Sequence, residues 1–246
     1  MAASVILLAA GRGKRFSSST PKVLALIDGK PVFLYSLLVF LAHPRVSEVV
    51  LVAGKESFPG LRAALKKTRF CKPVKMVLGG KERQDSVSCG LKNVSAASGL
   101  VLIHDAARPF ISRRLVDGVM RAASLYGAAV PGVPLKSTIK EISLSGGRGY
   151  GGSVVFTPER GCFCEVQTPQ AFKRGLILSA YSRIPDGRVF TDDASLVEEM
   201  GKPVRVAAGE YTNIKITTRE DLDYAAAIAR RAKKGDKVGV SHRHRL

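Results

Sequence analysis

The chain of 246 residues is poor in the side chains on which disulfide frameworks and many metal or nucleophilic sites depend: it has four cysteines, four histidines and no tryptophan. So few cysteines, scattered along a chain of this size, cannot form a disulfide scaffold and favour a reducing compartment. No Cys/His constellation with the spacing of a metal centre is present. Cys162 and Cys164 alternate along an expected strand, so we expect them to be buried structural thiols on one face.

Long apolar runs are also missing. The longest are broken within about ten residues, whereas a membrane-spanning helix needs roughly 20. The segment 1–10 leads straight into a strand-like run without a basic leader and cleavage site, so no secretory signal is expected. The sequence therefore predicts a cytoplasmic protein without a membrane partner.

Acidic residues are scarce, because 20 Asp and Glu stand against 39 Lys and Arg, which gives a net charge of +19. Such a field attracts nucleotides, phosphorylated metabolites or nucleic acid. Residues 230–246 alone hold seven Lys or Arg and one Asp, and a basic solvated end is the simplest interpretation of them. We expect one domain over residues 1–233 and a flexible basic tail over residues 234–246.

Short apolar runs alternate with helix-like stretches. Strands are expected at 4–8, 48–53, 74–78, 100–104 and 128–133, and helices at 32–42, 61–67, 85–93 and 112–126, the last capped by Ser112. This alternation predicts an α/β fold, a mostly parallel sheet with helices on both faces. Ligands of such a sheet lie at the carboxyl ends of its strands.

The stretch 137–167 breaks the alternation. Its glycine-rich centre, residues 143–153, lies between two β-like runs and predicts a projecting β-arm with a flexible tip. After it we expect a helix from Ala171, a helix at 193–200, a strand near Val204 and a last helix at 218–233.

The first strand ends in a glycine-rich loop that carries four cations and no acid: Arg12, Lys14, Arg15 and Lys22. Glycines allow close approach of a ligand, and successive N–H groups can form an anion-binding nest. Phe16 occupies the third glycine's place of G-x-G-x-x-G, and the P-loop pattern is absent, which argues against a dinucleotide site and a P-loop ATPase. An ordinary basic turn remains the alternative.

Two further polar clusters follow strands, at 79–86 and 104–109. The first could hold a base or ribose through backbone groups, or could simply be a capped helix start. In the second, Asp105 could hold Mg²⁺ against a triphosphate and Arg108 could bind a phosphate bidentately. Alternatively these two side chains pair with each other.

The chain has no G-x-S-x-G elbow and no evident nucleophile–base pair. This fits phosphoryl-type chemistry, because a phosphate monoester is largely a dianion at pH 7 and needs no general base. The protein must bring two anions together in line and stabilise charge at the attacked phosphorus, for which Lys, Arg and Mg²⁺ are suited.

Seven segments in order resemble the 2-C-methyl-D-erythritol 4-phosphate cytidylyltransferases of non-mevalonate isoprenoid synthesis. They cover roughly residues 4 to 225 and are Leu-Ala-Ala-Gly-x-Gly-x-Arg (8–15), Pro-Lys (21–22), Gly-Gly-x-Glu-Arg-x-Asp-Ser (79–86), His-Asp-Ala-Ala-Arg-Pro (104–109), Gln-Thr-Pro-Gln (167–170), Thr-Asp-Asp-Ala-Ser (191–195) and Asn-Ile-Lys-Ile-Thr (213–217). The resemblance implies a Rossmann-like nucleotidyltransferase fold and in-line attack of the substrate phosphate on the α-phosphorus of CTP, with release of pyrophosphate.

The resemblance also implies residue roles. Carried over by matching position, the catalytic cations are Arg15, Lys22 and Lys215; the nucleotide-binding residues are Ala9, Ala10, Gly11, Gly80, Ser86 and Asp105; and the residues that grip the methylerythritol phosphate are Arg108, Thr138, Arg160 and Thr191. Mg²⁺ is expected with the triphosphate, in the region of Asp105. A homodimer that exchanges its arms is expected, so that Thr138 and Arg160 act on the neighbour's site.

Three alternatives stay open. A ribitol-5-phosphate cytidylyltransferase looks similar, but its motifs more often read Ala-Gly-Gly and have valine before the arginine, so Ala10 and Ala107 favour methylerythritol phosphate. A nucleic-acid-binding protein would explain the charge, but no basic helix interleaved with aromatics and no RRM or zinc-finger pattern is present. A noncatalytic relative is disfavoured by the complete set of cations. Lys81 and Ser137 depart from the family pattern, which commonly has acids there.

Overall fold

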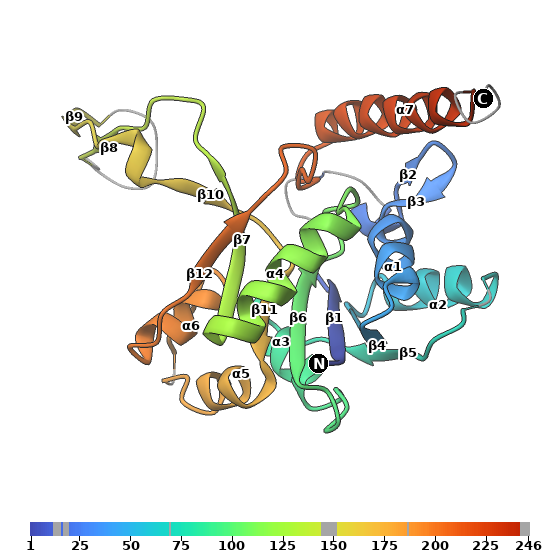
Figure 1. Ribbon diagram of the computed structural model, residues 1–246, viewed down its shortest axis with the longest axis horizontal. Helices are drawn as coiled ribbons and strands as arrows, with labels where there is room; N and C mark the ends of the chain where they lie inside the picture. Colours follow the sequence, from blue (N-terminus) through green and yellow to red (C-terminus); the bar gives the residue numbers. More distant parts are fainter. Residues whose placement is uncertain (12–15, 17–19, 69, 144–151, 186, 242–246) are drawn as a thin grey trace.

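The computed structural model describes residues 1–11, 16, 20–68, 70–143, 152–185 and 187–241, with the backbone alone over 233–241. Arg15 and the arm tip 144–151 therefore lie outside the described residues. The core is one sheet with the strand order β10-β7-β11-β6-β1-β4-β5, and β12 pairs with the free edge of β7 (Figure 1). Its strands are β1 Ala3–Ala9, β4 Val46–Ala53, β5 Val74–Leu78, β6 Leu100–Asp105, β7 Ala128–Pro134, β10 Cys164–Val166, β11 Gln170–Lys173 and β12 Arg205–Ala208.

Most of the sheet is parallel, as the alternation of elements predicts. Strand β1 pairs in parallel with β4 and β6, β4 with β5, and β12 with β7. The exceptions are β10 and β11, which run antiparallel to their neighbours. The carboxyl ends of β1, β5 and β6 consequently lie along one edge, where the three polar clusters of the sequence begin.

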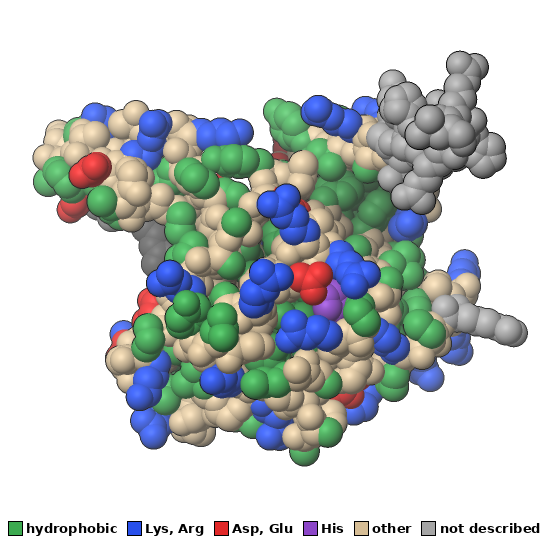
Figure 2. Space-filling view, viewed as in Figure 1, with side chains coloured by type: hydrophobic (Ala, Val, Ile, Leu, Met, Phe, Trp, Pro, Cys, Tyr) green, Lys and Arg blue, Asp and Glu red, His purple; other side chains and the backbone are tan. Residues whose placement is uncertain are grey.

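The arm leaves the body beyond β7 and β10 (Figure 1). Its hairpin consists of β8 Glu141–Ile142 and β9 Val154–Phe156, which pair antiparallel, and a 3-10 turn, η2 Arg160–Cys162, follows. The expected hairpin is confirmed, and Figure 2 shows hydrophobic side chains on its surface. Cys162 and Cys164 are both exposed. The prediction of buried thiols is wrong because in the single chain no second layer covers this stretch.

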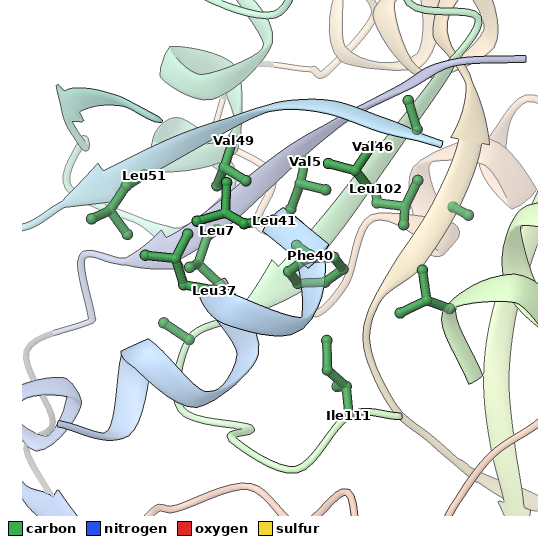
Figure 3. Packing of buried hydrophobic residues seen from close by; sticks show 14 of the residues in the cluster. Val5, Leu7, Leu37, Phe40, Leu41, Val46, Val49, Leu51, Leu102 and Ile111 are labelled. Atoms are coloured by element: carbon green, nitrogen blue, oxygen red, sulfur yellow. The ribbon is translucent and has the colours of Figure 1, made fainter. Parts of the chain in front are cut away.

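Helices cover both faces of the sheet, because side chains alternate along each strand. In β1, Val5 and Leu7 face one layer, while Ile6 and Leu8 face the other. The first layer consists of α1 Val32–Ala42, α2 Phe58–Lys66 and α4 Arg113–Tyr126; the second consists of α3 Arg83–Leu91, α5 Arg174–Tyr181 and α6 Ala194–Glu199. In Figure 3, the α1 side chains Leu37, Phe40 and Leu41 lie against the strand residues that face this first layer of helices.

Several boundaries agree with the sequence, and some elements do not. Helix α1 and strand β5 have the expected bounds, and Ser112 caps α4 by accepting a hydrogen bond from Leu115 N at 3.0 Å. The helix expected from Ala171 begins only at Arg174, since residues 170–173 form β11 between β6 and β7. A small hairpin, β2 Leu26–Ile27 and β3 Lys30–Pro31, was not predicted. Its turn is Asp28-Gly29, and Asp-Gly is a sequence typical of hairpin turns because both residues adopt positive φ, as they do here.

The last helix, α7 Glu220–Ser241, continues past Lys233 through most of the segment expected to be a flexible tail. The helix thus ends later than the expected Lys233, the flexibility of the tail stays a prediction, and residues 242–246 lie outside the described residues. Ala225 and Ala229 of α7 pack with Phe16, Ile27, Val32 and Ile216 in a third apolar cluster. None of the helices in the described ranges combines the length and apolar character that crossing a bilayer requires.

A buried carboxylate stabilises the amino-terminal end of the sheet. Glu48 of β4 is 5% exposed and accepts hydrogen bonds from Ser4 Oγ at 2.6 Å and Ser95 N at 2.5 Å, with Lys75 Nζ at 2.8 Å. Burial opposes ionisation of this group, but the bonds from Lys75, Ser4 and the Ser95 amide outweigh it and lower the pKa of Glu48.

We predict that Glu48→Gln destabilises the protein at pH 7 by about 1–3 kcal/mol, because buried donors lose a charged acceptor. A lowered folded-state pKa contributes stability above the unfolded pKa and loses it as the pH falls. The difference between wild type and variant should therefore shrink below the ordinary glutamate pKa. Urea unfolding from pH 7 to pH 3.5 measures it, and a difference that stays constant would contradict the assignment.

Candidate active site

Close backbone packing brings the first two polar loops together. A Cβ on Gly54, after β4, would lie 2.9 Å from Ala10 O, and a Cβ on Gly79 would lie 2.6 Å from Ser86 Oγ and 2.8 Å from Ala10 Cβ. Only glycine fits these places without displacing a neighbour. Ala10, Gly80 and Ser86, three of the expected nucleotide-binding residues, therefore lie close together at the strand ends.

Ser86 also shapes the loop that precedes α3. Its Oγ accepts a hydrogen bond from Gly80 N at 3.2 Å and donates one to Glu82 O at 3.1 Å. Asp85 accepts from Glu82 N at 2.9 Å, so the segment is a capped helix start, as the simpler interpretation held. Gly80 itself is exposed.

Asp105, the last residue of β6, is the centre of the site. It is 9% exposed, with Oδ2 at 2.6 Å from Lys215 Nζ and Oδ1 at 3.5 Å from Arg83 Nε. Burial opposes ionisation, but the charges of Arg83 and Lys215 outweigh it and hold the pKa of Asp105 far below its usual range. The carboxylate is therefore ionised at neutral pH, and it orients Lys215, whose side chain is 41% exposed.

Two contacts fix the segment that carries Lys215. Ile216 N donates to Ala107 O at 2.8 Å, which ties the segment to the turn after β6. The Ile216 side chain is fully buried in the same cluster as Phe16, the one described residue between 12 and 19. The glycine-rich loop and the Lys215 segment consequently share one apolar anchor.

The sequence motifs contain Arg83 and Asp193, but we assigned neither to the site. Arg83 Nη2 lies 2.7 Å from Asp193 Oδ2, and Tyr181 donates to Asp193 Oδ1 at 2.6 Å. The charges of Asp193 and Asp105 outweigh burial and raise the pKa of Arg83, while burial and Asp193 raise the pKa of Tyr181. Arg83 lies inside one of the motifs that resemble the family, so the sequence could have indicated that it belongs to the site. Tyr181 lies in none of these motifs.

Arg108 is 7% exposed and does not form the expected alternative ion pair with Asp105, whose cations are Lys215 and Arg83. Its Nη1 donates to Asn213 O at 2.8 Å, and its Nε has no partner among the described residues. Burial lowers the pKa of Arg108 even though Asp105 opposes that shift. A buried guanidinium with a spare donor is suited to an anionic ligand.

His104 lies against the backbone of Arg108 and the side chain of Thr168. Both of its ring nitrogens are engaged in these contacts, so it is not a metal ligand. Burial lowers its pKa to about 4, so the ring is neutral at pH 7. The contact of Nε2 with Arg108 O at 3.0 Å requires a proton on Nε2, and Nδ1 then accepts from Thr168 Oγ1 at 2.8 Å. Within the part of the chain that the structure describes, no three His, Cys, Asp or Glu side chains gather as metal ligands.

The remaining candidates lie on several other elements, and of these Ala9 directly follows Leu8, the register partner of Asp105. Thr138 and Arg160 are on the exposed arm, where Arg160 Nη1 donates to Lys136 O at 2.6 Å. Thr191 is exposed in the loop before α6, and Lys22 begins the 3-10 turn η1 Lys22–Leu24. Ala9 ends β1, and Gly11 is exposed just after it.

Comparison with known proteins gives one consistent result. The family model for 2-C-methyl-D-erythritol 4-phosphate cytidylyltransferase matches residues 3–231. A 2-C-methyl-D-erythritol 4-phosphate cytidylyltransferase of Clostridium botulinum is 42% identical over 220 residues, 89% of this chain and 93% of the relative. One of Bacillus licheniformis is 38% identical over 235 residues, 95% of this chain and 98% of the relative.

A solved structure agrees with these relatives. The crystal structure of the 4-diphosphocytidyl-2C-methyl-D-erythritol synthase from Anaerococcus prevotii is similar with a TM-score of 0.80 at 32% identity. The match covers 93% of this chain and 96% of that one. The similarity therefore extends over nearly the whole chain.

Proposed function

Because the chain belongs to the 2-C-methyl-D-erythritol 4-phosphate cytidylyltransferase family, we infer that it joins CTP to 2-C-methyl-D-erythritol 4-phosphate in isoprenoid biosynthesis. The products are 4-diphosphocytidyl-2-C-methyl-D-erythritol and pyrophosphate, so the protein is a nucleotidyltransferase. The observation that carries this function is the Asp105–Lys215 pair at 2.6 Å, placed where the two glycine loops meet the strand ends. The two relatives named above carry the methylerythritol name, which does not favour ribitol phosphate as the acceptor.

We propose that the cations of the site do the chemistry. The substrate phosphate attacks the α-phosphorus of CTP in line, and no base is needed because the attacking group is already anionic. Lys215, held by Asp105, bridges the two phosphates, and Arg15 and Lys22 bind the triphosphate and stabilise the charge that develops on it. Ala9, Ala10 and Gly11 contact the nucleotide through the backbone, while Gly80 and Ser86 read the cytosine.

Acceptor binding is assigned to Arg108, Thr138, Arg160 and Thr191. The spare Nε of buried Arg108 supports its part in this proposal. Thr138 lies between β7 and β8 and Arg160 lies in η2, both on the arm that projects from the body of the chain (Figure 1). Their role therefore requires the arm of one subunit to reach the site of another.

Mg²⁺ is proposed as the cofactor, and the donor set fits an ion that arrives with its substrate. Asp105 is the carboxylate of the site, and Mg²⁺ is commonly held by one or two carboxylates together with substrate phosphates. Asp105 would hold the ion from the protein side. When bound, the ion neutralises charge on the departing pyrophosphate.

We propose a homodimer formed through the arm. The arm and its base expose apolar side chains that a monomer leaves in water: Ile142, Val154, Val155, Phe156, Phe163 and Val166. At the base lies a groove of about 660 Å³ lined partly by Pro134, Phe163 and Val206. A contiguous apolar patch of this kind is typical of a protein–protein interface.

The cytoplasm is the proposed location. All four cysteines are free thiols, which agrees with a reducing compartment.

The activity is tested by pyrophosphate release with Mg²⁺ in a grid of CTP, UTP, ATP and GTP against methylerythritol phosphate and ribitol phosphate. We expect release with CTP and methylerythritol phosphate. Release with ribitol phosphate alone would reassign the acceptor, and no release from folded protein in any mixture would refute the enzyme.

The catalytic assignment predicts that Lys22→Ala and Lys215→Ala each lower kcat by about 100-fold or more, the usual loss when a group that stabilises transition-state charge is removed. Lys66→Ala, which removes an exposed cation at the end of α2, is the control and should keep full activity. Steady-state kinetics measure the effect, and circular dichroism verifies the fold. Wild-type turnover in either site variant would refute the assigned role of that lysine.

If the protein is a dimer formed through the arm, a charge introduced on the arm by substitution should shift the equilibrium toward the monomer. Val155→Asp should lower the mass measured by sedimentation and reduce turnover, because 61% of the Val155 side chain is exposed in the single chain. Val189→Asp, at an equally exposed valine in the loop before α6, is the matched control. A wild-type protein that is monomeric at all concentrations, or a dimer unaffected by Val155→Asp, contradicts the proposal.

A further inference from the structure

Asp193 is a fully buried carboxylate directly behind the active site, and the mechanism above gives it no role. Its Oδ1 accepts from the Tyr181 hydroxyl at 2.6 Å, and its Oδ2 lies 2.7 Å from Arg83 Nη2. Its backbone N donates to Gln170 Oε1 at 3.1 Å. An aspartate is rarely buried to this extent unless it is paired, and Asp193 is paired with both Arg83 and Tyr181.

Arg83 connects this carboxylate to the reaction centre. Its guanidinium reaches two acids at once, Asp193 through Nη2 at 2.7 Å and Asp105 through Nε at 3.5 Å. A planar guanidinium can span two acceptors in this way because its donors are fixed in one fork. The shorter contact is with Asp193, so Asp193 sets where Arg83 lies and keeps it at the longer distance from Asp105.

The position of Arg83 determines how Asp105 is shared. Asp105 Oδ2 is 2.6 Å from Lys215 Nζ, nearly an ångström shorter than the contact of Oδ1 with Arg83. In this cluster the two carboxylates of Asp105 and Asp193 balance the charges of the two cations, Arg83 and Lys215. If the charge of Asp193 is removed, both cations depend on Asp105 alone, and Arg83 competes with Lys215 for it.

We propose that Asp193 is a positioning residue for the transfer reaction: it holds Arg83 away from Asp105 and so leaves Asp105 free to orient Lys215. The proposal rests on the proposed function, in which Lys215 bridges the two phosphates. Asp193 acts through Arg83 and Asp105 and does not touch a substrate.

The same end of α3 also holds the loop expected to bind the acceptor. Gln84 Nε2 donates to Arg188 O at 2.9 Å, and Gln84 Oε1 accepts from Phe190 N at 3.0 Å. The loop with Thr191 is thus tied to α3 by Gln84 as well as by the Asp193–Arg83 pair. Because the Gln84 contacts remain when Asp193 is changed, we expect this loop to stay in place and the loss to appear in kcat.

The test is Asp193→Asn, which keeps the shape of the side chain and removes its charge. We expect kcat to fall by about 10- to 100-fold, the scale of a misplaced catalytic group, while KM for CTP changes by less than about threefold. Glu48→Gln is the matched control, because Glu48 is also a buried carboxylate bound to a hydroxyl and a cation, but at the opposite end of the sheet. It should lower the unfolding midpoint and leave kcat unchanged.

A double-variant cycle separates positioning from general damage. If Asp193 acts through Arg83, adding Asp193→Asn to Arg83→Gln should cause little further loss of kcat, whereas independent losses would multiply. Multiplied losses, or an Asp193→Asn protein with wild-type kcat, overturn the proposal.

Two further variants keep the test decisive if Asp193→Asn does not fold. Arg83→Lys retains the charge but lacks the fork that spans both acids, and Tyr181→Phe removes one donor to Asp193. We expect kcat to fall in both, and wild-type kcat in both overturns the proposal. The wild-type assay separates failure of the proposed function from failure of the positioning role. An inactive wild type refutes the proposed function. An active wild type whose variants are unaffected refutes only the positioning role of Asp193.

Discussion

The carboxylate of Asp105, buried at the end of a central strand and shared between two cations, is the interaction on which the site depends. An isolated carboxylate at this depth would be costly, and one paired with Lys215 and Arg83 is ionised at any physiological pH. The sheet supplies the rigidity, because β6 lies between β1 and β11 and cannot shift on its own. A flexible lysine is thereby given a defined place at the edge of a rigid sheet.

The loops around this carboxylate are held by side chains rather than by strand pairing. Asn213 Nδ2 donates to Thr168 O at 2.9 Å, and Gln167 Nε2 donates to Glu210 O at 2.9 Å. Thr168 also accepts from Asp105 N at 3.1 Å and contacts the neutral ring of His104. Buried side-chain hydrogen bonds of this kind restrict the loops to one geometry. The Gln-Thr-Pro-Gln and Asn-Ile-Lys motifs therefore act as structural supports of the site.

Periodicity predicted most of the fold, and chemistry predicted part of the site. The buried strands and the helices between them were legible because alternation and helical spacing are local properties. Strand β11 was not, because its apolar residues fit a helix equally well and its partners are distant in sequence. Asp105 and Lys215 were recognised from motifs, but their pairing across more than 100 residues was not. Tyr181 joins the site only through tertiary packing, so no pattern in the chain indicates it.

The insertion of β11 between β6 and β7 has a consequence for how the chain acquires its structure. Strands β6 and β7 follow each other in sequence, yet the space between them stays empty until residues 170–173 arrive from beyond the arm. On the ribosome, the first half of the sheet can assemble as it emerges, while β7 has to wait for a strand synthesised some forty residues later. Such non-local closure is slow because the intervening chain loses entropy before the contacts form. During that interval the backbone groups along one edge of β6 lack their partners in β11, and an unpaired strand edge is prone to aggregation.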